Sequence, residues 1–206
     1  MPTLLHLDSS PLDSSISREL TREFVRTWQN AHPADAVIHR DLAANPPKPV
    51  DTTWIYSSFT PAASRTVEQK EALALSDELI AELERADEYV IGVAMHNFSI
   101  PSVLKLWVDQ IVRNGRTFIA NAGERKGLLR DKKATFLVAS GGVYEGGTPA
   151  SALNFIDPYL KTIFGFIGVT DVKFVTASGA AQVMMGAVDR ATFLKPTLEA
   201  VRTVAA

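Results

Sequence analysis

The chain has 206 residues, of which 46% are apolar and 21% charged, and its formal net charge is −2. This length and mix are typical of one soluble α/β domain with a substantial core. The near-neutral charge excludes the basic field of a nucleic-acid binder and the polybasic segment of a membrane anchor. The chain has no cysteine, which excludes disulfides, a thiolate nucleophile and a cysteine-ligated metal or iron–sulfur cluster. No stretch has the pattern of a signal peptide or a membrane span, so we expect a cytoplasmic protein.

Short apolar runs alternate along the chain with amphipathic segments. The apolar runs predict buried strands at residues 4–7, 36–42, 89–95, 134–139 and 172–175. The helical spacing of apolar residues predicts helices at residues 17–29, 66–85, 102–114, 151–164 and 187–204. The alternation predicts a single α/β domain over residues 1–206, with a parallel sheet covered by helices on both faces.

Two connections are unusually long. Residues 49–64 look like a loop but carry Trp54, Tyr56 and Phe59, which predicts either a lid over a pocket or aromatic side chains tucked against the core. Residues 119–132 are polar and contain glycine, which predicts an exposed excursion.

The loop after the first strand is rich in hydroxyl groups. Its segment 13–18, Asp-Ser-Ser-Ile-Ser-Arg, lies at the start of the first predicted helix. A helix N-terminus offers unpaired N–H groups and partial positive charge, which suit a phosphate, and Arg18 would add charge. The loop has neither the glycine pattern of dinucleotide binders nor that of P-loop enzymes. It is typical of doubly wound folds that hold the phosphate of FMN, although Ser15 or Ser17 could instead simply cap the helix.

Two further loops follow predicted strands. Asn97 offers an amide and Phe98 an apolar wall after the third strand, while Gly141 and Gly142 follow the fourth. Paired glycines allow the backbone N–H groups to come close to a flat ring. Because the carboxyl ends of parallel strands meet at one edge of a sheet, the three loops together predict a site for a planar, amphipathic heterocycle.

Several sequence blocks resemble a known family. The most specific ones are His96-Asn97-Phe98-Ser99-Ile100-Pro101, Ser140-Gly141-Gly142-Val143-Tyr144 and Phe164-Gly165-Phe166-Ile167-Gly168. They are similar to blocks of the FMN-dependent NADH azoreductases, which are also quinone reductases, and the resemblance spans nearly the whole chain.

The resemblance implies a flavodoxin-like, doubly wound five-stranded parallel sheet in the order 2-1-3-4-5. It also implies a homodimer that binds one FMN tightly per subunit, with active sites at the dimer interface. Two electrons would pass from NADH or NADPH through FMN to quinones and aromatic azo compounds in a ping-pong cycle. Carried over onto this chain, the cofactor-binding positions are Ser10, Ser15, Ile16, Ser17, Met95, His96, Asn97, Phe98, Ala139, Ser140, Gly141 and Gly142.

The chain departs from the family pattern at two of these positions. His96 stands where the family commonly has tyrosine, and Ala139 replaces a hydroxyl residue. The flavin carries the chemistry, so no catalytic side chain is required. His96 as a proton donor is a hypothesis that competes with ordinary hydrogen bonding. Arg18, Arg65 and Arg125 are candidates for a contact with the 2′-phosphate of NADPH.

The remaining histidines and a set of apolar helix residues are expected to have structural roles. His6, His32 and His39 lack the spacing of metal ligands, so we expect structural roles for them and no metal site. Six apolar residues exceed what independent surface helices need, and we assign them partly to the core and partly to a dimer interface. These residues are Trp107, Ile111, Phe118, Phe155, Ile156 and Phe164.

Three alternative functions remain open from sequence. A flavodoxin-type electron carrier would use the same fold, but such carriers tend to be smaller and strongly acidic. A flavin-free interaction domain is a second alternative, because fold alone does not decide function. An NADPH-specific quinone reductase without azo activity is the third.

Overall fold

Five parallel strands form the central sheet of the computed structural model, which describes residues 2–121 and 123–206. The strands lie side by side in the order β2-β1-β3-β6-β7, and every neighbouring pair is parallel. Their bounds are β1 (Thr3–Asp8), β2 (Ala36–Asp41), β3 (Glu88–Ala94), β6 (Lys133–Ser140) and β7 (Asp171–Ser178). With β6 and β7 as the fourth and fifth strands of the sheet, the expected flavodoxin-like order is confirmed.

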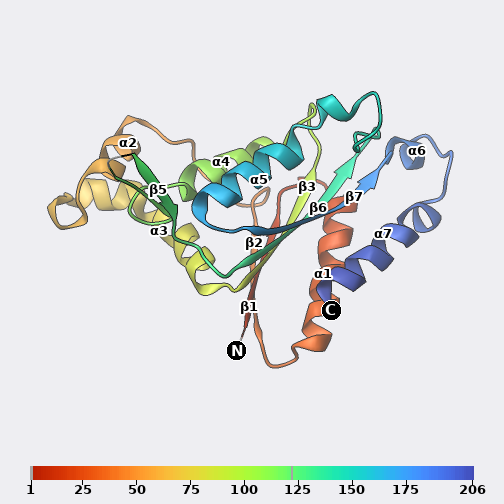
Figure 1. The fold of residues 1–206 in the computed structure, drawn as a ribbon, viewed down its shortest axis with the longest axis horizontal. Coiled ribbons are helices and arrows are strands. Elements are labelled where there is room, and N and C mark those ends of the chain that lie inside the picture. The colour runs from red at the N-terminus through yellow and green to blue at the C-terminus, as the bar shows by residue number, and fades with distance from the viewer. Residues whose placement is uncertain (1, 122) are drawn as a thin grey trace.

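Helices cover both faces of this sheet (Figure 1). On one face lie α1 (Ile16–Ala31) and α7 (Arg190–Ala205), and on the other α3 (Val67–Arg85), α4 (Ser102–Ile111) and α5 (Ile156–Ile167). Successive residues of a strand point to opposite faces. Accordingly, Leu4 packs with α1 and α7, and its neighbour Leu5 packs in the core beneath α3, α4 and α5. None of the helices in the described part of the chain is both long and apolar enough to cross a membrane.

Residues 49–64 are not the loop that the sequence suggested. They contain helix α2 (Thr52–Phe59) and a short 3-10 turn (Ala62–Ser64). Asp51 caps α2, since its carboxylate accepts a hydrogen bond from the Trp54 backbone N–H at 2.8 Å. An aspartate N-cap outweighs the weak helical propensity of this threonine- and serine-containing segment.

The aromatic side chains of this segment behave differently from one another. The indole N–H of Trp54 donates to the side-chain oxygen of Gln110 at 2.8 Å, which fastens the segment to α4. Tyr56 and Phe59 remain 69% and 75% exposed. One aromatic is therefore tucked against the body, and a lid function of the segment stays a prediction.

The polar excursion of residues 119–132 contains an antiparallel hairpin of β4 (Phe118–Asn121) and β5 (Glu124–Gly127). The hairpin ends against the C-terminus of α5, where a Cβ on Gly127 would lie 2.2 Å from the backbone nitrogen of Gly168. Only glycine permits this approach of two backbones.

Two predicted helices begin later than their apolar pattern suggested. Residues 151–153 form a 3-10 turn, and α5 starts at Ile156 because the Asn154 side chain accepts from the backbone N–H groups of Ile156 and Asp157 at 3.0 and 3.2 Å. Likewise α7 starts at Arg190, and a four-residue helix, α6 (Ala181–Met184), precedes it.

Candidate functional site

A cavity of about 440 Å³ lies where the loops after β1, β3, β6 and β7 meet. These loops follow the carboxyl ends of their strands, so the cavity occupies the edge of the sheet where ligands bind in open α/β folds. Of the twelve predicted cofactor contacts, those that line it are Ser10, Ser15, Ile16, Met95, His96, Ala139, Ser140 and Gly141. Asn97, Phe98 and Gly142 belong to the same loops and Ser17 to the first turn of α1, but these four are not among the lining residues.

The hydroxyl groups at the start of α1 are not used to cap the helix. Ser15 occupies the N-cap position, yet its side chain makes no capping hydrogen bond within the described structure. Its oxygen lies 2.9 Å from the hydroxyl oxygen of Ser17 instead. The N–H of Glu19 bonds back to the Ser15 carbonyl at 3.1 Å, so the amides of residues 16–18 have no partner within the helix. Free amides and paired hydroxyls at one helix end form an anion-binding arrangement.

Arg18 does not add its charge to the anion-binding arrangement at the start of α1, contrary to the expectation from sequence. Its side chain is buried and donates from Nε and Nη2 to the Ser10 carbonyl at 2.9 and 2.6 Å. Nη2 also forms an ion pair with Asp41 at 2.8 Å. Arg18 therefore supports the first loop from behind. This role also removes it as a candidate for contact with a nicotinamide 2′-phosphate.

The loop after β3 makes a tight reversal with unusual backbone geometry. The N–H of His96 donates to the Ser99 carbonyl at 2.9 Å, and the Ser99 N–H donates back at 3.0 Å. Between them Asn97 and Phe98 have φ values of 49° and 69°, which is typical of a two-residue hairpin turn. Phenylalanine rarely adopts positive φ, and such strain clusters at binding sites. The strained turn leaves the Phe98 ring 41% exposed, at 5.8 Å and nearly perpendicular to the Tyr144 ring.

The glycine loop after β6 is oriented by its carbonyl groups. The carbonyls of Ser140, Gly141 and Gly142 accept from the N–H groups of residues 180, 181 and 179, at 2.9, 3.1 and 3.0 Å. In a planar trans peptide the N–H points opposite to the carbonyl of the same unit. The N–H groups of Gly141 and Gly142 therefore point away from the 179–181 segment. A Cβ on Gly142 would come within 2.8 Å of the Tyr144 ring, so a side chain at this position would displace that ring.

The sequence analysis missed part of the cavity wall. Ser14, which lies in the predicted hydroxyl-rich segment, also lines the cavity, and the missed lining residues are Pro11, Leu12, Ala94, Ala180, Val183, Met184 and Arg190. Arg190 donates to the Ser14 carbonyl at 2.9 Å and pairs with Glu19 at 2.7 Å, which fastens α7 to the first loop. The segment around α6 follows the carboxyl end of β7, so the strand-end rule that located the other loops would also have located it.

The comparisons with known proteins agree with this architecture. A family model described as "Flavodoxin-like fold" matches residues 2–200. The chain belongs to this flavodoxin-like family. An FMN-dependent NADH:quinone oxidoreductase of Acidobacterium capsulatum is 61% identical over 206 residues, which are the whole of both chains. An FMN-dependent NADH:quinone oxidoreductase 3 of Burkholderia lata is 48% identical over 98% of each chain. The crystal structure of an azoreductase from Bacillus anthracis str. Sterne superimposes with a TM-score of 0.89 at 29% identity, over 100% of this chain and 99% of that one.

Within this flavodoxin-like sheet, His6 and Asp8 of β1 come together with His39 of β2, which is distant in sequence, next to the first loop. His6 and His39 are paired in register across β1 and β2, and their rings stack with centroids 4.4 Å apart. Both Nε2 atoms lie 3.2 Å from the same Asp8 carboxylate oxygen. Linear spacing gave no sign of this cluster. The argument from spacing against a shared metal site therefore does not hold for His6 and His39, whose ring nitrogens lie close to the same carboxylate.

The six apolar residues that the sequence analysis assigned partly to a dimer interface differ in burial. Trp107, Ile111, Ile156 and Phe164 are fully buried in the core beneath α3, α4 and α5. Phe155 is 53% exposed, and the half-buried Phe118 packs on Phe166. Four of the six are therefore core residues. Other large apolar side chains are exposed, among them Leu12 and Met184 in the lining of the cavity.

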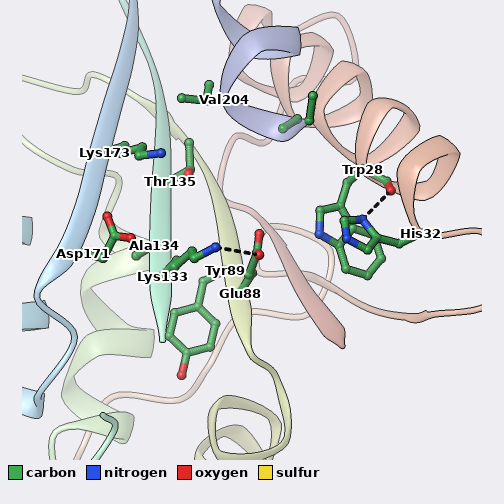
Figure 2. Close-up of a pocket in the computed structure, with 12 residues that line it drawn as sticks. Trp28, His32, Glu88, Tyr89, Lys133, Ala134, Thr135, Asp171, Lys173 and Val204 are labelled. Atoms are coloured by element: carbon green, nitrogen blue, oxygen red, sulfur yellow. Dashed lines mark hydrogen bonds and ion pairs between the residues drawn. The ribbon is translucent and has the colours of Figure 1, made fainter. Parts of the chain in front are cut away.

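The opposite edge of the flavodoxin-like sheet carries a smaller cavity of about 170 Å³ (Figure 2). It is lined by Glu88, Lys133 and Asp171, the first residues of β3, β6 and β7, together with Lys173. Lys133 and Glu88 face one another as an ion pair at 3.5 Å. The formal charges of these two lysines and two acids sum to zero.

Proposed function

We propose that this protein is an FMN-dependent NADH:quinone oxidoreductase that also reduces aromatic azo compounds. The observation that carries the proposal is the meeting of three loops around one cavity, in a chain that matches an FMN-dependent NADH:quinone oxidoreductase end to end. The residues present fit the cofactor. The uncapped start of α1 suits its phosphate, and the strained turn and the glycine loop suit a flat ring.

The first loop would bind the phosphate through the amides of residues 16–18 and the hydroxyls of Ser10, Ser15 and Ser17. The Asn97 turn and Met95 would lie along one edge of the ring, and His96, Ala139 and Ser140 beside them. The N–H groups of Gly141 and Gly142 would donate to the polar edge of the ring. Each assignment uses a group that the fold leaves free of internal partners or fixes in position.

When bound, FMN accepts a hydride from NADH and passes two electrons on to a quinone or an azo compound. The protein's part is orientation: Phe98 forms an apolar wall against which the nicotinamide and then the acceptor lie in turn. Among the described residues that line the cavity, Arg190 carries the one charged side chain, and it is paired with Glu19. His96 lines the cavity as an exposed imidazole and could donate a proton to the acceptor, although water has equal access.

A homodimer is part of the proposal. Met184 and Leu12, which line the cavity, are 89% and 64% exposed, and Met185, next to Met184, is 73% exposed. Large exposed apolar side chains around a binding site are typical of a surface that another chain covers. Sedimentation at micromolar concentration should show twice the chain mass, and a monomer would remove this part of the proposal. The proposed compartment is the cytoplasm, which fractionation of expressing cells would test.

The decisive experiment is purification followed by a visible spectrum and anaerobic titration with NADH and, separately, NADPH. We expect a yellow protein that NADH bleaches within one turnover and that menadione or an azo dye recolours. A colourless protein that stays so after addition of FMN would favour a flavin-free interaction domain. A yellow protein that free NADH cannot reduce would favour an electron carrier, and bleaching by NADPH alone would favour the NADPH-specific alternative.

A further inference from the structure

We propose that His6, Asp8 and His39 form a binding site for one divalent transition-metal ion, of which Zn²⁺ is the representative. The site lies between strands β1 and β2 on the face covered by α1. It does not depend on the proposed redox function.

The donor atoms lie close enough together to share one ion once the half-exposed His39 ring, which stacks on His6 at 25°, turns its Nε2 toward the space between them. The ligand atoms of the three residues lie within 4.8 Å of one another, and each Nε2 is 3.2 Å from the same Asp8 oxygen. Tetrahedral bonds of 2.0–2.1 Å place neighbouring ligand atoms about 3.3 Å apart. Two imidazoles and one carboxylate are a donor set that zinc accepts, with a fourth position left for water.

One of these donor atoms, the Nε2 of His6, makes no hydrogen bond to a described residue. The His6 side chain is only 9% exposed, and its Nε2 has no hydrogen-bond partner among the residues described. Its approach to Asp8 lacks the alignment of a hydrogen bond. A buried nitrogen without a partner costs stability, because it has lost its contact with water. A metal ion in front of His6 would satisfy it.

The surroundings prepare Asp8 as a ligand. The Thr21 hydroxyl donates to the other carboxylate oxygen at 2.8 Å, which fixes the plane of the group in the way that outer contacts orient metal ligands.

The net charge of the groups around the cluster favours a cation. Arg18 approaches the Asp8 oxygen to 3.5 Å, but its shorter contacts go to Ser10 and Asp41. Asp8, Asp41 and Arg18 together carry one net negative charge when both histidines are neutral. The entrance lies at His39, whose side chain is 51% exposed on the edge strand β2.

The test uses the full-length, FMN-loaded protein, stripped with EDTA and dialysed against micromolar ZnCl₂. Elemental analysis should give about one zinc per chain for the unaltered protein and less than about a tenth of that for His39→Ala. Zinc at a hundredfold excess over its Kd should raise Tm by roughly 5–10 °C in the unaltered protein only. His39 is largely exposed, so His39→Ala should fold, and Asp8→Asn offers a second ligand deletion whose folding the metal-free Tm reports.

The matched control is His32→Ala. It removes an imidazole that stacks on Trp28, away from β1 and β2, and it should bind as much zinc as the unaltered protein. The proposal is overturned if the unaltered protein takes up no zinc, or if His39→Ala retains it. Loss of zinc from His32→Ala would likewise overturn it, because the metal would then be bound elsewhere.

Discussion

The two edges of the sheet have the same strands and helices but opposite surface chemistry. The cavity at the carboxyl edge is bounded by hydroxyls, glycine backbone and apolar side chains, whereas the one at the amino edge is bounded by balanced acids and lysines. At the amino edge Lys133 pairs with Glu88 and the Thr3 N–H donates to Asp87 at 2.8 Å, while the buried indole Nε1 of Trp28 has no partner among the described residues. At the carboxyl edge the first turn of α1 is left uncapped. The comparison teaches that free backbone amides at a helix N-terminus, more than a hollow or a single unpaired donor, mark the binding edge.

Placing a negative charge at the start of α1 should have the largest effect. In Ser15→Asp the new carboxylate faces the FMN phosphate, and repulsion of about 3 kcal/mol should raise the Kd for FMN by about 100-fold. Aspartate is a favourable N-cap residue, so the helix itself should persist. Fluorescence titration of the apoprotein measures the change.

Ser15→Ala is the matched control, because it removes the hydroxyl without adding charge. Its Kd should rise by no more than about tenfold. If Ser15→Asp binds FMN as tightly as the unaltered protein, the phosphate does not lie at this helix end.

A change near the amino edge should lower the stability of the fold and leave FMN binding unchanged. In Gly127→Ala the added Cβ meets the backbone of Gly168, which cannot move aside as a flexible side chain would. We expect a loss of about 2 kcal/mol in the free energy of unfolding, with the Kd for FMN unchanged at 25 °C. Urea denaturation and flavin titration measure the two quantities.

Gly165→Ala, on the exposed side of α5, is the companion variant, since nothing among the described residues lies within 4 Å of the added Cβ. It should gain about 0.5–1 kcal/mol of stability. A stable Gly127→Ala protein would contradict the close packing of hairpin and helix.

Two ion pairs between α7 and α1 allow a direct comparison of the edges. Arg190 pairs with Glu19 and holds the first loop, while Arg202 pairs with Glu23 farther toward the amino edge. Arg190→Ala should raise the Kd for FMN by about tenfold, and Arg202→Ala by less than about twofold. Equal increases in the Kd for FMN would mean that FMN binding depends on the packing of α7 as a whole and not on support of the first loop.

The smallest effect is expected at His96. Because water reaches the cavity, His96→Tyr and His96→Ala should change kcat for quinone reduction by less than about threefold and leave its pH profile unaltered. A profile that becomes flat in both variants would show that His96 supplies the proton.

The sequence predicted most of the fold because apolar strands and amphipathic helices have clear periodicities. Helix α2 was not predicted because its start depends on one cap, Asp51. Helix α6 was not predicted because four residues are too few to show a helical period. The first, second and third site loops were found because each follows a strand. Arg190 and the His6–His39 pair were not, because helix packing and strand register bring together residues that are distant in the chain.

The most direct test of the convergence of the three loops is a ¹H–¹⁵N NMR titration of the apoprotein with FMN. The amides of Ser17, Asn97, Gly141 and Gly142 should shift together and saturate at one FMN per chain, while those of Lys133 and Lys173 stay in place. Shifts confined to one loop, or centred on the amino edge, would contradict the account.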